Sequence, residues 1–191
     1  MGVVLSSSAS TSARERLLAR LLEAFGEDLP APKMSLREIA ARTETSHALL
    51  RYHFGSLSGV LAAMLKTQRS RDNEVLFEAA QRGTFDDLVR AIWQTYTRPE
   101  QLSRVRGFFH LAGLAAYSPQ DFREFIESLD DLTRMLATLA EREGLDATEA
   151  LAAATVTVAA IRGLLLQEIL SPIAHSEDAV ALILRMSKNR S

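Results

Sequence analysis

The stretch of the chain with the most chemistry is TSHALLRYHFGS, residues 45–56, which combines hydroxyl, basic and aromatic side chains on a short segment. Arg51 can donate to guanine or to phosphate oxygens, and Tyr52 and His53 can reach phosphates. Leu49 can contact the methyl group of thymine. Side chains of these types on one segment indicate a surface that reads double-stranded DNA.

The beginning of the same stretch suits a phosphate group. Thr45, Ser46 and His47 stand at the expected start of a helix, where unpaired backbone amides and the helix dipole attract anions. The next residue, Ala48, is small enough to allow close approach to a base edge. A plainer interpretation stays open, namely an ordinary surface helix with a solvated arginine and half-buried aromatic rings.

A helix-turn-helix unit at residues 35–54 would position these side chains. Ser35 and Glu38 have the spacing of a capping box at the start of a short helix, and RTET provides a tight connection. Ser46 is a natural N-cap for a second short helix, which Gly55 ends. In such units the second helix enters the major groove of DNA.

The two faces of this second helix follow from the helical period. With Leu50 at the centre of one face and about 100° per residue, Phe54 and Ser46 lie within about 40° of it. We expect Leu50 and Phe54 to pack inward on Ile39 and on the leucine-rich helix at residues 13–25. The outward face then carries Ala48, Leu49, Arg51 and Tyr52.

Apolar residues recur at spacings of three and four along nearly the whole chain, and the alternation typical of strands is missing. The sequence therefore predicts an all-α protein of nine helices. Caps, glycines and prolines place them at about residues 13–25, 36–42, 47–53, 57–80, 85–97, 99–117, 118–143 and 146–171, with a last helix capped by Ser176.

The composition is typical of a soluble globular protein. Of 191 residues, 47% are hydrophobic and 24% charged, cysteine is absent, and the longest uncharged apolar run has twelve residues. We expect no transmembrane helix, no membrane association and a cytoplasmic location. The sequence shows no metal-ligand spacing, catalytic motif or glycine-rich phosphate loop, so we expect neither enzyme activity nor a metal or cofactor.

The last two predicted helices are more apolar than ordinary surface helices. LAAATVTVAAIRGLLLQEIL has small and apolar residues all round, and DAVALILRM has hardly a polar face. We expect a second copy of the chain to cover them, which predicts a homodimer through the last two helices. Burial of both helices in the core of a monomer is the alternative.

The run SLREIAARTETSHALLRYHFGSLSGVLAAML, preceded by the leucine-rich segment from Arg14 to Phe25, resembles the DNA-binding domain of TetR-family transcriptional regulators. The resemblance covers about the first third of the chain. It implies a helical homodimer whose first three helices bind DNA, while the C-terminal part forms a ligand cavity and the dimer interface. The DNA contacts that it implies are Ser35 to phosphate, Thr45, Ser46, His47, Ala48, Leu49 and Arg51 toward the groove, and Tyr52 and His53 to the backbone.

Three positions depart from the pattern of the family. Arg51 stands where a tyrosine is frequent, Leu57 where a phosphate-binding lysine is common, and Glu44 where a glycine usually precedes the recognition helix. Residues 33–56 carry four basic and two acidic side chains, a local charge of +2 in a chain of net charge −2. We expect modest nonspecific affinity for DNA with a shallow dependence on salt.

Aromatic residues concentrate in the middle of the chain, where a mainly apolar ligand cavity is expected. The candidate ligand contacts are Trp93, Tyr96, Arg106, Phe109, His110, Tyr117 and Arg162. Ordinary core packing is the alternative for each aromatic residue among them.

The sequence thus predicts a disordered tail at 1–11, a DNA-binding domain at 12–56 and an effector-binding and dimerisation domain at 57–191. The predicted function is a homodimeric transcriptional repressor that an unknown small, mainly apolar ligand releases from a palindromic operator. The alternatives are a DNA-associated architectural or protein-interaction module with no effector, and a helical interaction protein that does not bind DNA.

Overall fold

A computed structural model describes residues 12–26, 28–31, 33–172 and 174–188. Every regular element in these ranges is a helix, which confirms the predicted all-α fold. The tail predicted at 1–11 lies outside the described residues.

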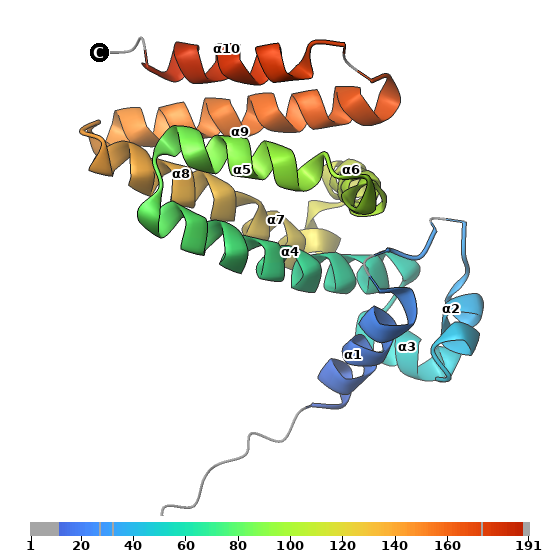
Figure 1. The fold of residues 1–191 in the computed structure, drawn as a ribbon. Coiled ribbons are helices and arrows are strands. Elements are labelled where there is room, and N and C mark those ends of the chain that lie inside the picture. The colour runs from blue at the N-terminus through green and yellow to red at the C-terminus, as the bar shows by residue number, and fades with distance from the viewer. Residues whose placement is uncertain (1–11, 27, 32, 173, 189–191) are drawn as a thin grey trace, which may run out of the picture.

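Three short helices form a head at one end of a long one (Figure 1). They are α1 (Ala13–Phe25), α2 (Leu36–Arg42) and α3 (His47–Phe54), and the long helix is α4 (Leu57–Arg82). Capping boxes start α1 at Ser12 and α2 at Ser35, as the sequence predicts.

A sharp bend separates α3 from α4. The two helices meet at 68° across Gly55 and Ser56, and the Ser56 hydroxyl accepts a hydrogen bond from the Gly59 amide at 3.1 Å. A Cβ atom at Gly59 would lie 1.9 Å from the carbonyl oxygen of Phe54. Only glycine at this position lets α4 start so close to the end of α3.

The remaining helices stack on the far side of α4 (Figure 1). The longer ones are α5 (Phe85–Tyr96), α6 (Leu102–Tyr117), α8 (Asp131–Arg142), α9 (Ala147–Leu170) and α10 (Ser176–Lys188), with a short 3₁₀ turn, η1 (Pro99–Gln101), before α6. In Figure 1, α10 lies outermost and packs along α9. Ser176 is the first residue of α10 and not its N-cap, since the His175 carbonyl accepts the Ala179 amide at 3.1 Å.

Two hydrophobic cores share α4. The first joins α1, α2 and α3 to the N-terminal half of α4, and the second joins the C-terminal half of α4 to α5, α8, α9 and α10. The first core does not end at residue 56, because Leu111 of α6 and Phe125 also belong to it. The loop after α1 is tied to α6 as well: a Cβ at Gly107 would lie 2.2 Å from Leu29 Cδ1.

The prediction of one continuous helix at residues 118–143 is wrong. The segment consists of η2 (Pro119–Phe122), α7 (Arg123–Glu127), η3 (Ser128–Asp130) and α8. The chain passes here from one core to the other, since Phe125 is buried in the first core and Leu132 in the second.

At this break, side chains form hydrogen bonds with backbone carbonyl groups. The Ser128 hydroxyl donates back to the Phe125 carbonyl at 2.7 Å, which competes with helical hydrogen bonding. Arg69 donates to the Ser128 carbonyl at 3.1 Å, and Arg162 donates to the Leu129 carbonyl at 2.6 Å. These two carbonyls accept hydrogen bonds from arginines of other helices. They therefore do not need the backbone amide that would be their partner in a continuous helix.

Among the described helices, α9 is long and apolar enough to cross a bilayer by length and composition alone, with a mean hydropathy of 1.6. The bent pair of α3 and α4 passes the same test when taken as one span. Core helices of soluble proteins pass it too, and 39% of the apolar stretch of α9 is buried inside the chain. The expectation of no membrane association stays a prediction.

Candidate functional site

The helix α3 is divided into a buried and an exposed face. Leu50 has no exposed surface and Phe54 is buried, whereas Leu49 is 48% exposed and Tyr52 is 83% exposed. Arg51 and Ala48 are also exposed. The predicted inward pair and outward set are therefore confirmed as positions on the helix.

The N-terminal end of α3 is capped by a serine that is exposed to solvent. The Ser46 hydroxyl oxygen accepts a hydrogen bond from the Leu49 amide at 3.1 Å. Ser46 is exposed, and Thr45 and His47 on either side of it are half-buried. The hydroxyl hydrogen of Ser46 remains able to donate to an anion, because capping uses only its oxygen.

Ser35 is the N-cap of α2, and the family resemblance implies that it contacts phosphate. In the structure its hydroxyl already has a negatively charged partner. Its hydroxyl donates to Glu38 Oε2 at 2.8 Å and accepts from the Glu38 amide at 3.3 Å. Hydrogen bonds from the Ser35 backbone amide and hydroxyl lower the pKa of the Glu38 carboxyl. A phosphate at Ser35 has to compete with this carboxylate.

Glu44 keeps the turn between α2 and α3 in a left-handed conformation. Its φ is 49°, the only positive φ of a non-glycine residue in the described part of the chain. The Thr45 amide donates to the Ala40 carbonyl at 2.9 Å and the Glu44 amide to the Ala41 carbonyl at 3.4 Å. These are the two hydrogen bonds of a Schellman motif, so the turn forms without the usual glycine.

The exposed aromatic end of α3 is ordered by ring contacts. The rings of Tyr52 and His53 meet edge to face, with centroids 4.9 Å apart and planes at 83°. The Arg14 guanidinium lies 5.2 Å from the centre of the Phe54 ring and links α1 to the same end. Tyr52 remains 83% exposed beside these contacts.

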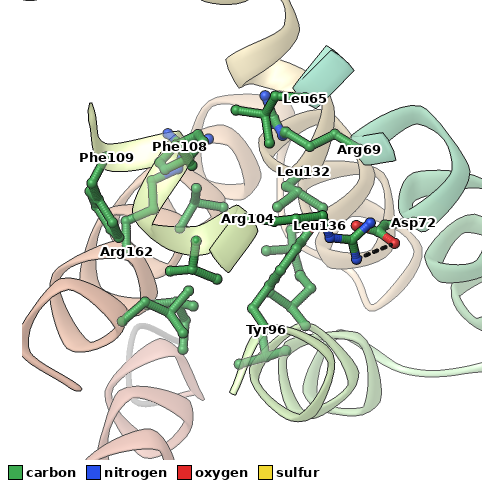
Figure 2. Close-up of a pocket in the computed structure, with 16 residues that line it drawn as sticks. Leu65, Arg69, Asp72, Tyr96, Arg104, Phe108, Phe109, Leu132, Leu136 and Arg162 are labelled. Atoms are coloured by element: carbon green, nitrogen blue, oxygen red, sulfur yellow. Dashed lines mark hydrogen bonds and ion pairs between the residues drawn. The ribbon is translucent and has the colours of Figure 1, made fainter. Parts of the chain in front are cut away.

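A cavity of about 60 Å³ lies between α4, α5, α6, α8 and α9 (Figure 2). Its lining is mostly apolar and includes four charged side chains: Arg69, Asp72, Arg104 and Arg162. Figure 2 shows Arg104 and Asp72 joined by a hydrogen bond, which measures 3.2 Å from Nη2 to Oδ1.

Three of the seven predicted ligand contacts line this cavity: Tyr96, Phe109 and Arg162. Trp93 instead is buried in the second core, where its Nε1 donates to Glu177 at 2.9 Å. Arg106 is exposed, His110 is half-buried outside the lining, and Tyr117 is 92% exposed.

The helical period of α6 explains these corrections. The side chains of α6 that reach the cavity are Arg104, Val105, Phe108 and Phe109. These four recur at spacings that form one helix face. Arg106, His110 and Tyr117 point elsewhere, because the sequence does not show which face of α6 meets α4 and α9.

The charged lining residues Arg69, Asp72 and Arg104 are absent from the predicted ligand contacts. One signal of them is present in the sequence, since Leu65, Arg69, Asp72 and Leu76 follow the 4-3-4 spacing of a single helix face. Two charges on a face that is otherwise apolar indicate a polar feature within a core.

The charges around the cavity are only partly neutralised. Burial lowers the pKa of Arg69, and Tyr96 and the carboxylates of Asp131 and Asp72 partly offset this effect. Burial and the nearby positive charge of Arg69 lower the pKa of Arg162. Burial, with the Asp72 carboxylate adding to it, raises the pKa of Tyr96 to about 12, so this hydroxyl keeps its proton at neutral pH.

No family model matches the chain, and no curated protein matches it. Solved structures of similar fold are known. A TetR transcriptional regulator from Legionella pneumophila superposes with a TM-score of 0.66 at 18% identity, over 93% of this chain and 98% of that one. A transcriptional regulator from Rhodococcus has a TM-score of 0.66 at 20% identity, over 93% and 97% of the two chains. The reduced form of NemR from Escherichia coli has a TM-score of 0.60 at 21% identity, with the same coverage.

Proposed function

We propose that this chain, which has the all-α fold of TetR-family transcriptional regulators, is a member of that family and binds DNA through α3. It acts as a homodimeric repressor that leaves a palindromic operator when a small, mainly apolar ligand enters the cavity. Ser35, Thr45, Ser46, His47, Ala48, Leu49, Arg51, Tyr52 and His53 are its proposed DNA contacts.

The observation that carries this proposal is the exposed face of α3. An arginine, a tyrosine and a leucine stand outward on this helix, next to a leucine and a phenylalanine that hold it to the head. Exposed tyrosine and leucine side chains contribute nothing to the core, and their types suit phosphate, base-edge and thymine-methyl contacts. The neighbours of similar fold described as transcriptional regulators agree with a DNA-binding role.

The proposed dimer rests on an apolar surface that the described part of the chain leaves open. One stripe of α9 is exposed along its whole length, and α10 exposes two large apolar side chains beside it. The stripe consists of Ala152, Val156, Ala159, Gly163, Leu166 and Leu170, and the two side chains are Leu182 and Met186. Small residues in such a stripe allow another helix to approach closely.

The proposed ligand control rests on the position of α4. This helix belongs to the core of the head and also supplies Leu65, Arg69 and Asp72 to the cavity. A ligand that prefers one position of α4 would change the separation of the two α3 helices of a dimer, which must match half-sites about one DNA turn apart.

Selection of bound sites from random DNA by the purified full-length protein tests DNA binding directly. We expect a palindromic site, which the Arg51→Ala, Tyr52→Ala double variant binds at least about thirtyfold more weakly, because each lost contact contributes roughly 1–3 kcal/mol. The Tyr117→Ala, Arg123→Ala variant removes an exposed tyrosine and an exposed arginine that are not part of α3 and is the matched control.

Equal retention of DNA by the α3 double variant and the wild type would defeat the DNA-binding proposal. Recovery of sites without twofold symmetry would defeat the dimeric arrangement on DNA. The dependence of affinity on salt, measured on the same site, is expected to be shallow because the local charge of residues 33–56 is only +2.

A further inference from the structure

The cavity between α4, α5, α6, α8 and α9 has more positive than negative charge in its lining. Three guanidinium groups line it, those of Arg69, Arg104 and Arg162, against the single carboxylate of Asp72, a formal charge of +2. We propose that the effector is an amphipathic acid, with an apolar body and one anionic head group such as a carboxylate that pairs with Arg69 and Arg162. This inference rests on the proposed function, because it names the chemical class of the ligand of that cavity.

Asp72 is already paired with one of the three arginines. Its Oδ1 accepts from Arg104 Nη2 at 3.2 Å, and both side chains are largely buried, at 15% and 5% exposure. Arg104 also donates to Gln101 Oε1. The remaining two arginines therefore determine the charge that a ligand meets.

Arg69 and Arg162 lie close together and donate to neutral acceptors. Their guanidinium carbons are 5.3 Å and 5.7 Å from the centre of the same ring, that of Phe108. Arg69 donates to the hydroxyl and carbonyl oxygens of Ser128 at 3.0 and 3.1 Å, and Arg162 donates to the Leu129 carbonyl at 2.6 Å.

The nearest carboxylates outside the lining are engaged or exposed. Asp131 accepts from Asn73 at 3.3 Å and from Arg134 at 2.5 Å, and Asp130 is exposed to solvent. Neither lines the cavity. Arg69 is buried and Arg162 is half-buried, and both guanidinium groups lie against one ring and donate only to neutral acceptors. Each positive charge therefore raises the free energy of the other, and a bound anion lowers it.

The rest of the lining fits the apolar body of such a molecule. Aliphatic side chains from α5, α8 and α9 cover it, among them Val89, Ile92, Leu136 and Ile161. The Tyr96 hydroxyl is buried in the same lining and has no hydrogen-bond partner at normal distance and angle. It can donate a hydrogen bond to an anionic oxygen of the ligand.

The size of the cavity indicates how the ligand enters. Its volume is about 60 Å³, whereas a cavity of about 150 Å³ is known to hold benzene. An acid must therefore widen the cavity as it binds. Its head group can do so by taking the hydrogen bonds that Arg69 and Arg162 now give to η3, which releases α4 and α9 from that turn.

Ligand-observed NMR titrations of the purified full-length protein test the ligand class without DNA. The probes are straight-chain carboxylates from butanoate to decanoate, with the alcohols and amines of the same chain lengths. We expect carboxylates to bind at least about tenfold more tightly than the matched alcohols, and amines no better than alcohols, because hydrogen bonds to charged groups are the stronger ones.

The variant Arg162→Gln should remove this preference while leaving alcohol binding within about threefold, and Arg162→Lys, which keeps the charge but not the planar guanidinium, should keep part of it. Retained alcohol binding shows that the cavity of the glutamine variant is intact. If that variant does not fold, Arg69→Gln, which removes the other guanidinium proposed to pair with the head group, is measured in its place. Arg106→Gln, which removes an exposed arginine of α6 outside the lining, is the matched control and should bind like the wild type.

Equal binding of acids and alcohols, or no binding of any probe, would overturn the proposal, as would loss of the acid preference in Arg106→Gln. Release of operator DNA is measured separately. Acid-selective binding that leaves DNA affinity unchanged supports the ligand class and defeats ligand control, whereas DNA release by neutral probes alone supports ligand control and defeats the ligand class.

Discussion

Leu49 and Leu50 are chemically identical neighbours with opposite environments. Leu50 has no exposed surface and packs in the first core, whereas Leu49 is 48% exposed on the outer face of α3. One residue of helix turns the side chain by about 100°, which is enough to separate a residue that stabilises the head from one that is exposed to solvent.

Truncation of each leucine separates the two roles. Leu50→Ala is expected to lower the free energy of unfolding by about 2–5 kcal/mol, because it leaves a cavity in a fully buried site. Leu49→Ala is expected to change stability by less than about 0.5 kcal/mol and to weaken binding to the selected DNA site. Urea denaturation and DNA titration of both variants measure the two effects.

The two alanine variants serve as controls for each other. A stability loss in Leu49→Ala as large as that in Leu50→Ala would show that the exposed face of α3 supports the fold. In that case the exposure of Leu49 would no longer support a role for this side chain in DNA binding.

At the scale of elements, the turn between α2 and α3 contains the backbone strain of the head. Glu44 adopts a φ of 49°, which is costly for a residue with a Cβ atom. The hydrogen bonds of the Schellman motif and the burial of Thr43 beside it hold this conformation in place.

Glu44→Gly is therefore expected to stabilise the protein by up to about 1 kcal/mol, since relief of the left-handed strain exceeds the entropic cost of glycine. The control is Ala41→Gly, three residues earlier in the helical part of α2, which should destabilise by roughly 0.5–1 kcal/mol. Thermal and urea unfolding of both variants test this, and a loss of stability in Glu44→Gly would contradict it.

The break between α7 and α8 is also an effect at the scale of elements. A continuous helix would place Phe125 and Leu132 about two turns apart along one axis, yet they belong to different cores. The 3₁₀ turn η3 separates α7 from α8 and presents the carbonyls of Ser128 and Leu129 to Arg69 and Arg162.

At the scale of the whole molecule, α4 connects the head to the stacked helices of the other core. Gln68 near its middle is buried and donates to the Gly26 carbonyl at 3.2 Å, while Arg69 next to it lines the cavity. Adjacent residues of α4 thus contact the end of α1 and the candidate ligand site. The proposed ligand control would use this contact to pass a displacement of α4 at the cavity on to the head.

The proposed dimer predicts a specific failure of assembly. Leu182→Glu with Met186→Glu places two carboxylates on the exposed apolar face of α10, where a partner copy would bury them unpaired. We expect sedimentation equilibrium to give a monomer for this variant, with loss of binding to the palindromic DNA site and unchanged helical content.

Val75→Glu with Phe77→Glu is the matched control, because these side chains are exposed on α4, away from α9 and α10. It should remain a dimer. If the Leu182→Glu, Met186→Glu variant is still a dimer, the interface lies elsewhere. That result would contradict assembly through the last two helices.

The sequence by itself determined the class of the fold, the caps of the head helices and the two faces of α3. These features depend on residues within a few positions of one another, through the helical period and through hydrogen bonds between a side chain and the first turn. Ser35, Ser46 and Leu50 could therefore be placed before any contact between distant segments was known.

Only the tertiary structure decided where the cavity lies, why residues 118–143 are broken and which charges line the candidate ligand site. Arg69, Arg162 and Phe108 come from three helices far apart in the chain, and their meeting depends on which face each helix buries against the others. A pattern along one helix shows that a face is apolar but not which other helix covers it, because packing depends on residues that are distant in sequence.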